Sequence, residues 1–313
     1  MNSNNIKSNS ENLELLKRYE QAQVMKVTQE EFAEQEGLSF KSLQSKIFRT
    51  RLKIKGTPPA DFKGFDRPEL YDWKLPTEWS FDWNDFMVIG DVQLPTTDYE
   101  FAMLPALIAK KYLKKPRKLI IAGDFYNMDA WSKYKNAIPV PSWEQEKESA
   151  RNLLAIYAQT FDEMWMLSGN HERRLLEHLG GQVDVQDVLS ASLPGGHVKA
   201  TVLDRCTVNT SQGKYTVLHG DNYSKKSLNN ADEWAQKFQT HIISHHEHHA
   251  AIGMDRFDRY YIVNNGGLFD QKKMAYVQLK TNTCANMSNG FTMVRNGYPE
   301  LFSDFTDWGK WLK

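Results

Sequence analysis

The stretch Met164-Trp165-Met166-Leu167-Ser168-Gly169-Asn170-His171-Glu172 shows the pattern on which the chain is built, an apolar run that ends in a polar turn. A run of about four apolar residues bounded by glycine and polar groups predicts a buried strand. Four other stretches have the same form, so we expect five strands of one α/β core. They are residues 86–89 before Gly90-Asp91-Val92-Gln93, 119–122 before Gly123-Asp124, 215–218 before His219-Gly220-Asp221, and 241–243 before the histidine-rich residues 245–249.

The residues that follow these strands are of the types that bind metal ions. Open α/β sheets bind ligands at the carboxyl ends of their strands. A pair of divalent cations about 3.5–4 Å apart needs a bridging carboxylate and a mixed shell of Asp, Asn and His. Singly, Asp91 or Asp124 could cap a helix, Asn170 could be a turn residue, and His219 could be a core histidine. The five strand ends together predict a centre that holds two metal ions and acts on phosphoryl groups.

The composition is that of an ordinary globular protein. The chain has 313 residues, of which 41% are hydrophobic and 25% charged, enough for one large domain and a small one. The formal net charge is zero, so any surface that binds polyanions must be local. Residues 1–12 lack a signal-peptide core, and no stretch approaches the roughly 18 apolar residues of a membrane span. Cys206 and Cys284 make no disulfide framework and are expected to be small buried side chains in a reducing cytoplasm.

Residues 12–55 predict a small all-α domain, preceded by a polar tail, residues 1–11, that we expect to be disordered. Thr28 and Glu31 form a capping-box signal, Gly37 ends a short helix, and Ser39 can cap the next one. Helix, glycine-containing turn and helix make the helix-turn-helix pattern. Residues 37–49 resemble the promoter-reading C-terminal region of sigma factors.

The second helix of this pattern carries a basic run, residues 41–55, without an acidic residue. Its exposed face offers side chains that suit phosphates and base edges. The residues expected to contact DNA are Lys41, Ser42, Gln44, Ser45, Lys46, Arg49 and Arg51. The alternative is a helical module for self-association, with its basic residues merely solvated.

A connector rich in proline and aromatic residues, 56–84, leads to a large domain at 85–302. Periodicity predicts helices and further strands between and after the five strands. The helices are expected at residues 99–114, 143–161, 172–179 and 230–240, and the strands at 198–203, 260–263, 275–280 and 291–294. Residues 181–197 are expected to be irregular. The C-terminal tail, residues 303–313, carries two tryptophans that we expect to pack on the domain.

The polar strand ends follow the motif order of a known family. Gly123-Asp124, Gly169-Asn170-His171-Glu172, His219-Gly220 and His246-Glu247-His248 resemble the second to fifth motifs of the calcineurin-like metallophosphoesterase superfamily. Asp91 with Gln93 stands in the place of the first motif, usually Asp-x-His. The resemblance covers most of the large domain and implies a two-sheet β-sandwich core flanked by helices.

The resemblance also implies a role for each matching residue. One metal ion would be held by Asp91, Gln93, Asp124 and His248. The other would be held by Asp124, as the bridge, with Asn170, His219 and His246. His171 would donate a proton to the leaving oxygen. Arg173 would hold a phosphate oxygen, unless it forms a surface ion pair.

Two positions depart from the family pattern. Gln93 offers an amide oxygen in place of an imidazole, which favours Mn²⁺ or Mg²⁺ over Zn²⁺; we expect Mn²⁺, with Mg²⁺, Fe and Zn²⁺ as alternatives. In the Ser/Thr phosphatase branch, a final Asp of the second motif orients the catalytic His. Here Asn127 stands in that place and Asp129 follows, which leaves the partner of His171 open. The neighbours His241, His245 and His249 are expected around the site or exposed.

These features predict a two-metal phosphodiesterase or nuclease that acts on DNA and is recruited by its helix-turn-helix. It is similar to the phage-encoded and DNA-repair nucleases of the superfamily, and we expect it in the cytoplasm, or in the host cytoplasm if phage-encoded. The second hypothesis is a phosphatase or pyrophosphatase that acts on nucleotides or phosphoproteins. The third is a DNA-binding regulator with a vestigial metal core.

Overall fold

The structure, a computed structural model, describes residues 3–55, 76–133, 139–192, 197–274 and 287–313. The chain divides into two compact units, Met1–Trp73 and Lys74–Lys313. None of the helices in the described ranges is long and apolar enough to cross a membrane.

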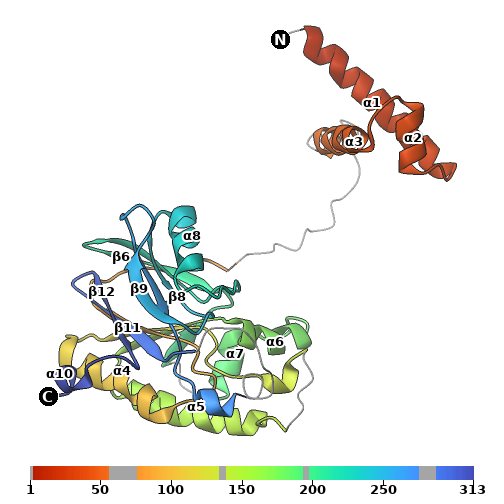
Figure 1. Ribbon diagram of the computed structural model, residues 1–313. Helices are drawn as coiled ribbons and strands as arrows, with labels where there is room; N and C mark the ends of the chain where they lie inside the picture. The colour runs from red at the N-terminus through yellow and green to blue at the C-terminus, as the bar shows by residue number, and fades with distance from the viewer. Residues whose placement is uncertain (1–2, 56–75, 134–138, 193–196, 275–286) are drawn as a thin grey trace, which may run out of the picture. The chain divides into compact units, whose positions relative to one another are not determined.

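The N-terminal unit consists of three helices, α1 (Ser3–Val24), α2 (Gln29–Gln35) and α3 (Phe40–Lys55) (Figure 1). The capping box forms as predicted, because the Glu31 amide donates to the Thr28 hydroxyl and the Thr28 amide donates to the Glu31 carboxylate. A small core joins the helices: Leu15, Leu16, Tyr19, Phe32, Ala33, Leu43 and Ile47. The helix α1 begins at Ser3, where a disordered tail was expected. Once a helix is nucleated, each further residue adds a hydrogen bond.

The second unit contains two six-stranded sheets. The first sheet has the order β1 (Ser80–Asp82), β6 (Arg205–Thr210), β7 (Gly213–Leu218), β8 (His241–Ser244), β10 (Tyr261–Asn265) and β9 (Ala250–Met254). The second sheet has the order β12 (Tyr298–Ser303), β11 (Gly290–Arg295), β2 (Phe86–Ile89), β3 (Lys118–Ala122), β4 (Glu163–Leu167) and β5 (Val198–Ala200).

Alternation along β2 shows how the layers form. Phe86 and Val88 belong to the core between the two sheets, where they pack with residues of β6, β7 and β8. Met87 and Ile89 point the other way, into the core beneath the helices. Successive side chains of a strand alternate between faces, so a strand that is buried on both faces reads as a continuous apolar run.

Helices cover the outer faces of the two sheets (Figure 1). The helices α4 (Tyr99–Tyr112) and α5 (Trp143–Ala158) pack on the second sheet, and α8 (Asn229–Phe238) packs on the first. This α/β architecture confirms the predicted two-sheet sandwich flanked by helices. Because β2, β3 and β4 run parallel, as do β7 and β8, the ends of each group lie at one edge of their sheet.

Several local expectations are corrected. Residues 80–82 of the expected connector form β1, which pairs with β6. Within 181–197, Asp184 caps a short helix, α7 (Val185–Ser190). The strands β6, β9 and β12 were not predicted. The strand expected at 275–280 lies outside the described residues, as does Cys284.

The C-terminal tail packs as predicted. Its short helix α10 (Trp308–Trp311) places the Trp308 ring in a stacked arrangement on Phe302, with centroids 5.9 Å apart. Trp311 meets the same ring edge-on at 4.8 Å. Residues 303–313 therefore belong to the folded domain. Cys206 is buried in the core between the sheets, as expected of a small apolar side chain.

Candidate metal centre and active site

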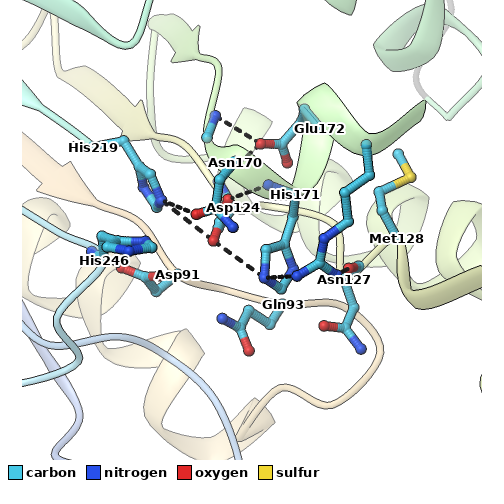
Figure 2. A network of polar contacts seen from close by, with 12 residues as sticks. Asp91, Gln93, Asp124, Asn127, Met128, Asn170, His171, Glu172, His219 and His246 are labelled. Carbon is cyan, nitrogen blue, oxygen red and sulfur yellow. Dashed lines mark hydrogen bonds and ion pairs between the residues drawn. The ribbon is translucent and has the colours of Figure 1, made fainter. Parts of the chain in front are cut away.

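The predicted ligands follow the carboxyl ends of β2, β3, β4, β7 and β8, and Figure 2 shows those that it labels, all but His248, close together. Five of them have a left-handed backbone, with φ values of 46° for Asp91, 51° for Gln93, 49° for Asp124, 75° for His246 and 59° for His248. This region is uncommon for residues with a Cβ atom, and each such residue costs about 1–3 kcal/mol, which the surrounding structure must offset. Such clustered strain is typical of a functional site.

Two glycines let the strand ends approach closely. A Cβ atom on Gly169 would lie 2.1 Å from Asp124 Oδ1. A Cβ atom on Gly90 would lie 2.6 Å from His245 Nδ1. Both contacts are shorter than atoms tolerate, so only glycine fits beside these two side chains. The glycine that ends each strand thus allows the donor groups to reach one another.

Asp91, Gln93 and His248 form one half of the centre. Asp91 Oδ1 lies 2.9 Å from His248 Nε2, which lies 3.2 Å from Gln93 Nε2. The backbone amide of His246 donates to Asp91 Oδ2 at 2.9 Å. Gln93 Oε1 is buried and has no hydrogen-bond partner among the described residues. A buried orphan acceptor beside a carboxylate and an imidazole fits a cation-binding position.

Asp124, Asn170, His219 and His246 form the other half. Ligand atoms of Asp124, His219 and His246 all lie within 4.8 Å of one another. His219 Nε2 lies 3.3 Å from Asp124 Oδ2 and 3.0 Å from Asn170 Oδ1. The four predicted donors are therefore gathered at one point. Their residue types suit a divalent cation.

His171 lies on the opposite side of Asp124 from His219 (Figure 2). Its backbone amide donates to Asp124 Oδ1 at 2.8 Å, and its Nε2 atom lies 3.5 Å from Asp124 Oδ2. Burial lowers the pKa of His171 to about 4. The positive charge of Arg174 lowers it further, and the two effects outweigh the negative charge of Asp124, which raises it. The imidazole is neutral in this arrangement.

Glu172 supports the site in a way that the sequence did not indicate. Its buried carboxylate accepts hydrogen bonds from four backbone amides, those of Asp124, Phe125, Tyr126 and Gly169. The helix α6 (Asn170–His178) begins directly after Gly169, so Asn170 and His171 lie in its first turn, where a loop was expected. Glu172 thus ties the loop after β3 to the start of α6. A carboxyl group in that turn also interacts favourably with the helix dipole.

A second buried carboxylate, Glu146 of α5, supports the same loop. Both of its oxygens accept from the backbone amide of Met128, at 3.1 and 3.0 Å. Met128 has a left-handed φ of 52°. Burial raises the pKa of Glu146 to about 8. The sequence did not indicate this role for Glu146, because a glutamate in a helix is normally exposed to solvent.

His241, His245 and His249 are all buried, so of the two alternatives expected for them, around the site or exposed, the exposed one does not apply. His245 lies 3.4 Å from Asp91 Oδ2 through Nδ1 and 3.1 Å from the Asn265 side chain through Nε2. His241 accepts from the Tyr261 amide and donates to the Gln212 carbonyl, so it is a satisfied core histidine. His249 is also buried. These histidines belong to β8 and the turn after it, which are buried, so their side chains do not reach solvent.

Three residues near His171 have partners that the sequence left open. Arg173 forms an ion pair with Asp221. Asn127 donates through Nδ2 to Asp129 Oδ2 at 2.7 Å. Asp129 in turn accepts from Arg174 at 3.0 Å, and Arg174 lies 2.7 Å from His171 Nε2. The group next to His171 Nε2 is therefore Arg174, and the Asp129 carboxylate contacts Arg174 and not the ring.

In the N-terminal unit, the side chains predicted to contact DNA lie largely on the surface of α3. Lys41, Gln44, Ser45, Lys46 and Arg51 are exposed, and Ser42 is half-buried. The Arg49 side chain lies outside the described residues. Arg51 lies 3.5 Å from Glu20. Lys41, Gln44, Ser45 and Arg51 line a groove together with the exposed ring of Phe48.

The sequence pattern of the calcineurin-like phosphoesterase family matches residues 85–282. The chain belongs to the calcineurin-like phosphoesterase family. Members of this family bind divalent metal ions, and the cluster of Asp124, His219 and His246 has the donor atoms that could hold one. A comparison with curated proteins gives no match.

Several solved structures are similar to this phosphoesterase. A Vps29 single mutant from Entamoeba histolytica is 10% identical, with a TM-score of 0.38, and the match covers 70% of this chain and 97% of that one. A conserved uncharacterized protein, a predicted phosphoesterase from Streptococcus pneumoniae TIGR4, is 12% identical, with a TM-score of 0.31 and coverage of 70% and 97%. Vps29 from Chaetomium thermophilum is 11% identical, with a TM-score of 0.37 and coverage of 67% and 84%.

Proposed function

We propose that this calcineurin-like phosphoesterase uses two divalent cations to hydrolyse phosphodiester bonds of DNA, and that its N-terminal helices bring it to DNA. The observation that carries the hydrolase part is the gathering of seven donor side chains, Asp124 among them, at five strand ends. The observation that favours DNA is the exposed basic face of α3 on a chain with zero formal net charge.

The donor set divides into two groups that share Asp124. Asp91, Gln93 and His248 would hold one cation with Asp124. The second cation would be held by Asp124, Asn170, His219 and His246. A pair of divalent cations polarises the phosphoryl group and stabilises the charge of an in-line displacement. The amide oxygen of Gln93 favours Mn²⁺ or Mg²⁺.

The remaining chemistry belongs to residues of the chain. His171, next to Asp124, would take up a proton and pass it to the leaving oxygen from its imidazolium form. Arg173 is partly exposed and would bind a non-bridging phosphate oxygen in exchange for Asp221. Glu172 would keep the Asp124 backbone in its left-handed conformation throughout the reaction. This arrangement binds a phosphate, and it protonates the departing alcohol from the His171 side.

The basic face of α3 supports nucleic acid as the substrate. Phosphate contacts from lysine and arginine provide affinity without sequence preference, and Gln44 and Ser45 on the same face have the donors and acceptors that read base edges. A small unit of this kind raises the local concentration of DNA at the phosphoesterase domain through the chain that joins them. Because the whole chain has zero formal net charge, attraction of DNA to the rest of its surface is weak.

The test is a screen of the purified protein with Mn²⁺ against four substrate classes. These are labelled double- and single-stranded DNA, bis(p-nitrophenyl) phosphate, p-nitrophenyl phosphate, and nucleoside diphosphates. We expect cleavage of DNA and of the diester. Hydrolysis of the monoester or the nucleoside diphosphates with intact DNA would instead assign the chain as a phosphatase or pyrophosphatase, the function that Gln93 would favour. Binding of DNA with less than one metal ion per chain and no turnover would mean a DNA-binding regulator.

A further inference from the structure

A groove with an apolar floor lies along α3 in the N-terminal unit. It has a volume of about 540 Å³, within the range of roughly 300–1,000 Å³ that is usual for sites of small organic groups. The buried side chains of Leu43 and Ile47 line it together with the Tyr19 ring of α1. Polar groups lose free energy on an apolar surface that offers them no hydrogen bond. The floor of the groove therefore fits an apolar surface better than a phosphate.

Phe48 lines the same groove with an exposed ring. The residue is 64% exposed and is not part of the core that joins the three helices. Lys41, Gln44 and Ser45 also line the groove. These four residues follow one another at spacings of one to four, and positions three and four apart share a helix face. An exposed aromatic ring among cationic and polar side chains is the combination with which proteins bind unpaired bases.

Two cations line the groove far apart on the helix. Lys41 and Arg51 both line it, and ten residues of an α-helix span about 15 Å. Arg51 lies 5.8 Å from the centroid of the Tyr19 ring and 3.5 Å from Glu20. The ion pair is solvent-exposed, with about half of each side chain accessible, so it contributes little free energy and a phosphate can take the place of the carboxylate. Phe48 lies between the two cations in the sequence.

We propose that this groove binds an unpaired base of single-stranded DNA, stacked on Phe48, with the neighbouring phosphates on Lys41 and Arg51. In a duplex the bases stack on one another and present only their edges in the grooves. In a single strand each base has a free face, and stacking on an aromatic ring does not depend on which base it is. The inference rests on the proposed function, in which α3 binds DNA, and narrows that DNA to single-stranded segments.

The first test measures binding of the full chain in EDTA, so that no strand is cut. A labelled oligothymidylate and a labelled duplex are titrated and followed by fluorescence anisotropy. We expect Phe48→Ala to weaken binding of the single strand on the order of 5- to 100-fold and binding of the duplex by less than about twofold. The slope of log affinity against log salt should stay the same, because Phe48 carries no charge. Arg51→Ala should lower that slope by about 0.7 for each phosphate that it no longer neutralises.

Further variants separate stacking from apolar contact. Phe48→Leu keeps an apolar side chain without a ring and should bind the single strand about as weakly as Phe48→Ala, whereas Phe48→Trp should bind it within about twofold of the unchanged protein. Phe40→Ala removes another partly exposed ring of α3, 39% exposed, that is not among the residues lining the groove. It is the matched control and should change neither affinity. All variants should unfold at the same temperature as the unchanged protein, because neither ring belongs to the helical core.

Three results would overturn the proposal. Equal losses for single strand and duplex in Phe48→Ala would mean that Phe48 contacts a feature that both share. Full binding of the single strand by Phe48→Leu would mean apolar contact without stacking. Unchanged DNA binding by Phe48→Ala, with a shift in oligomeric state on sedimentation, would assign the groove to self-association of the chain.

The binding measurements stand apart from catalysis. If the Mn²⁺-loaded protein cleaves no DNA while its single-strand affinity depends on Phe48 as expected, the proposed hydrolysis of DNA fails and the assignment of the groove stands. If the protein cleaves DNA and Phe48→Ala binds single strands as tightly as the unchanged protein, the assignment of the groove fails alone.

Discussion

His219 Nε2 lies 3.3 Å from Asp124 Oδ2, while His219 Nδ1 lies 2.9 Å from the carbonyl oxygen of Ala122. The carbonyl can only accept, so Nδ1 carries a proton and Nε2 faces the carboxylate. The lone pair of His219 Nε2 and the Asp124 carboxylate are both acceptors, so a proton or a cation must lie between them. Burial lowers the pKa of His219, but the charge of Asp124 outweighs it and raises the pKa to about 10, so a proton fills this position when no cation does. Cation binding must displace that proton.

Asp124→Ala should therefore abolish both metal binding and turnover, because it removes the carboxylate that both groups of donors share. His171→Ala should abolish turnover and leave metal content unchanged, because His171 is next to the centre but is not one of its predicted ligands. Metal content by atomic emission and hydrolysis rates, measured on the same preparations, check both expectations. Equal metal content in the two variants would contradict the assigned roles.

Gln93→His should change the preferred metal. The orphan Oε1 of Gln93 is a hard donor, and an imidazole in its place is a better ligand for Zn²⁺. We expect the ratio of Zn²⁺ to Mn²⁺ affinity to rise on the order of 10-fold or more, measured by competition between the two ions. Gln93→Glu, which keeps an oxygen donor, is the matched control and should not raise this ratio.

Glu172→Gln should destabilise the large domain. The substitution replaces a carboxylate that accepts from four amides with a group that has one acceptor oxygen, so at least one buried amide loses its partner. Each such loss costs about 1–3 kcal/mol. Urea unfolding followed by tryptophan fluorescence measures the change. Glu177→Gln, on the exposed part of the same helix, should change the free energy of unfolding by less than about 0.5 kcal/mol.

Glu146 predicts a specific pH dependence of stability. Burial raises the pKa of Glu146 to about 8 in the folded protein, above its ordinary value of 4.5. The folded state therefore binds this proton more tightly than the unfolded chain does. Its contribution to stability is fully present below pH 4.5 and is lost as the pH rises through 8, with a slope of up to about 1.4 kcal/mol per pH unit.

Glu146→Gln should remove that slope, because glutamine keeps an acceptor for the Met128 amide and does not titrate. The measurement is the free energy of unfolding at intervals from pH 5 to pH 9. The free energy of unfolding of the variant should increase relative to that of the unchanged protein as the pH rises. A constant difference across this range would mean that Glu146 does not change its protonation on unfolding.

The basic face of α3 can be tested without removing the unit. Lys41→Ala combined with Lys46→Ala should weaken binding to DNA of any sequence, and the slope of log affinity against log salt should fall by about 0.9 for each phosphate that the variant no longer neutralises. Lys17→Ala with Lys26→Ala removes two exposed lysines elsewhere in the same unit and serves as the control. If both pairs shift the slope equally, the effect is net charge and not a binding face.

Short-range patterns predicted much of this protein. The five apolar runs formed strands, the Thr28 capping box formed, and the order of Gly-Asp, Gly-Asn-His and His-Gly motifs indicated the family. These features can be recognised from neighbouring residues, because apolar runs, short motifs and helix caps each span only a few positions of the chain. The strands β1, β9 and β12 escaped prediction because they lie at sheet edges and bury few side chains.

The sequence by itself thus determined the fold class and the types of residue available to bind metal. Only the tertiary structure decided which polar groups meet, such as Asp91 with His248, or the loop after β3 with Glu172, Glu146 and Arg174. Those contacts join residues far apart in the chain, and their geometry depends on the strand register, the left-handed turns and the burial of each group. For the same reason, an arginine with no family motif to mark it stands next to His171.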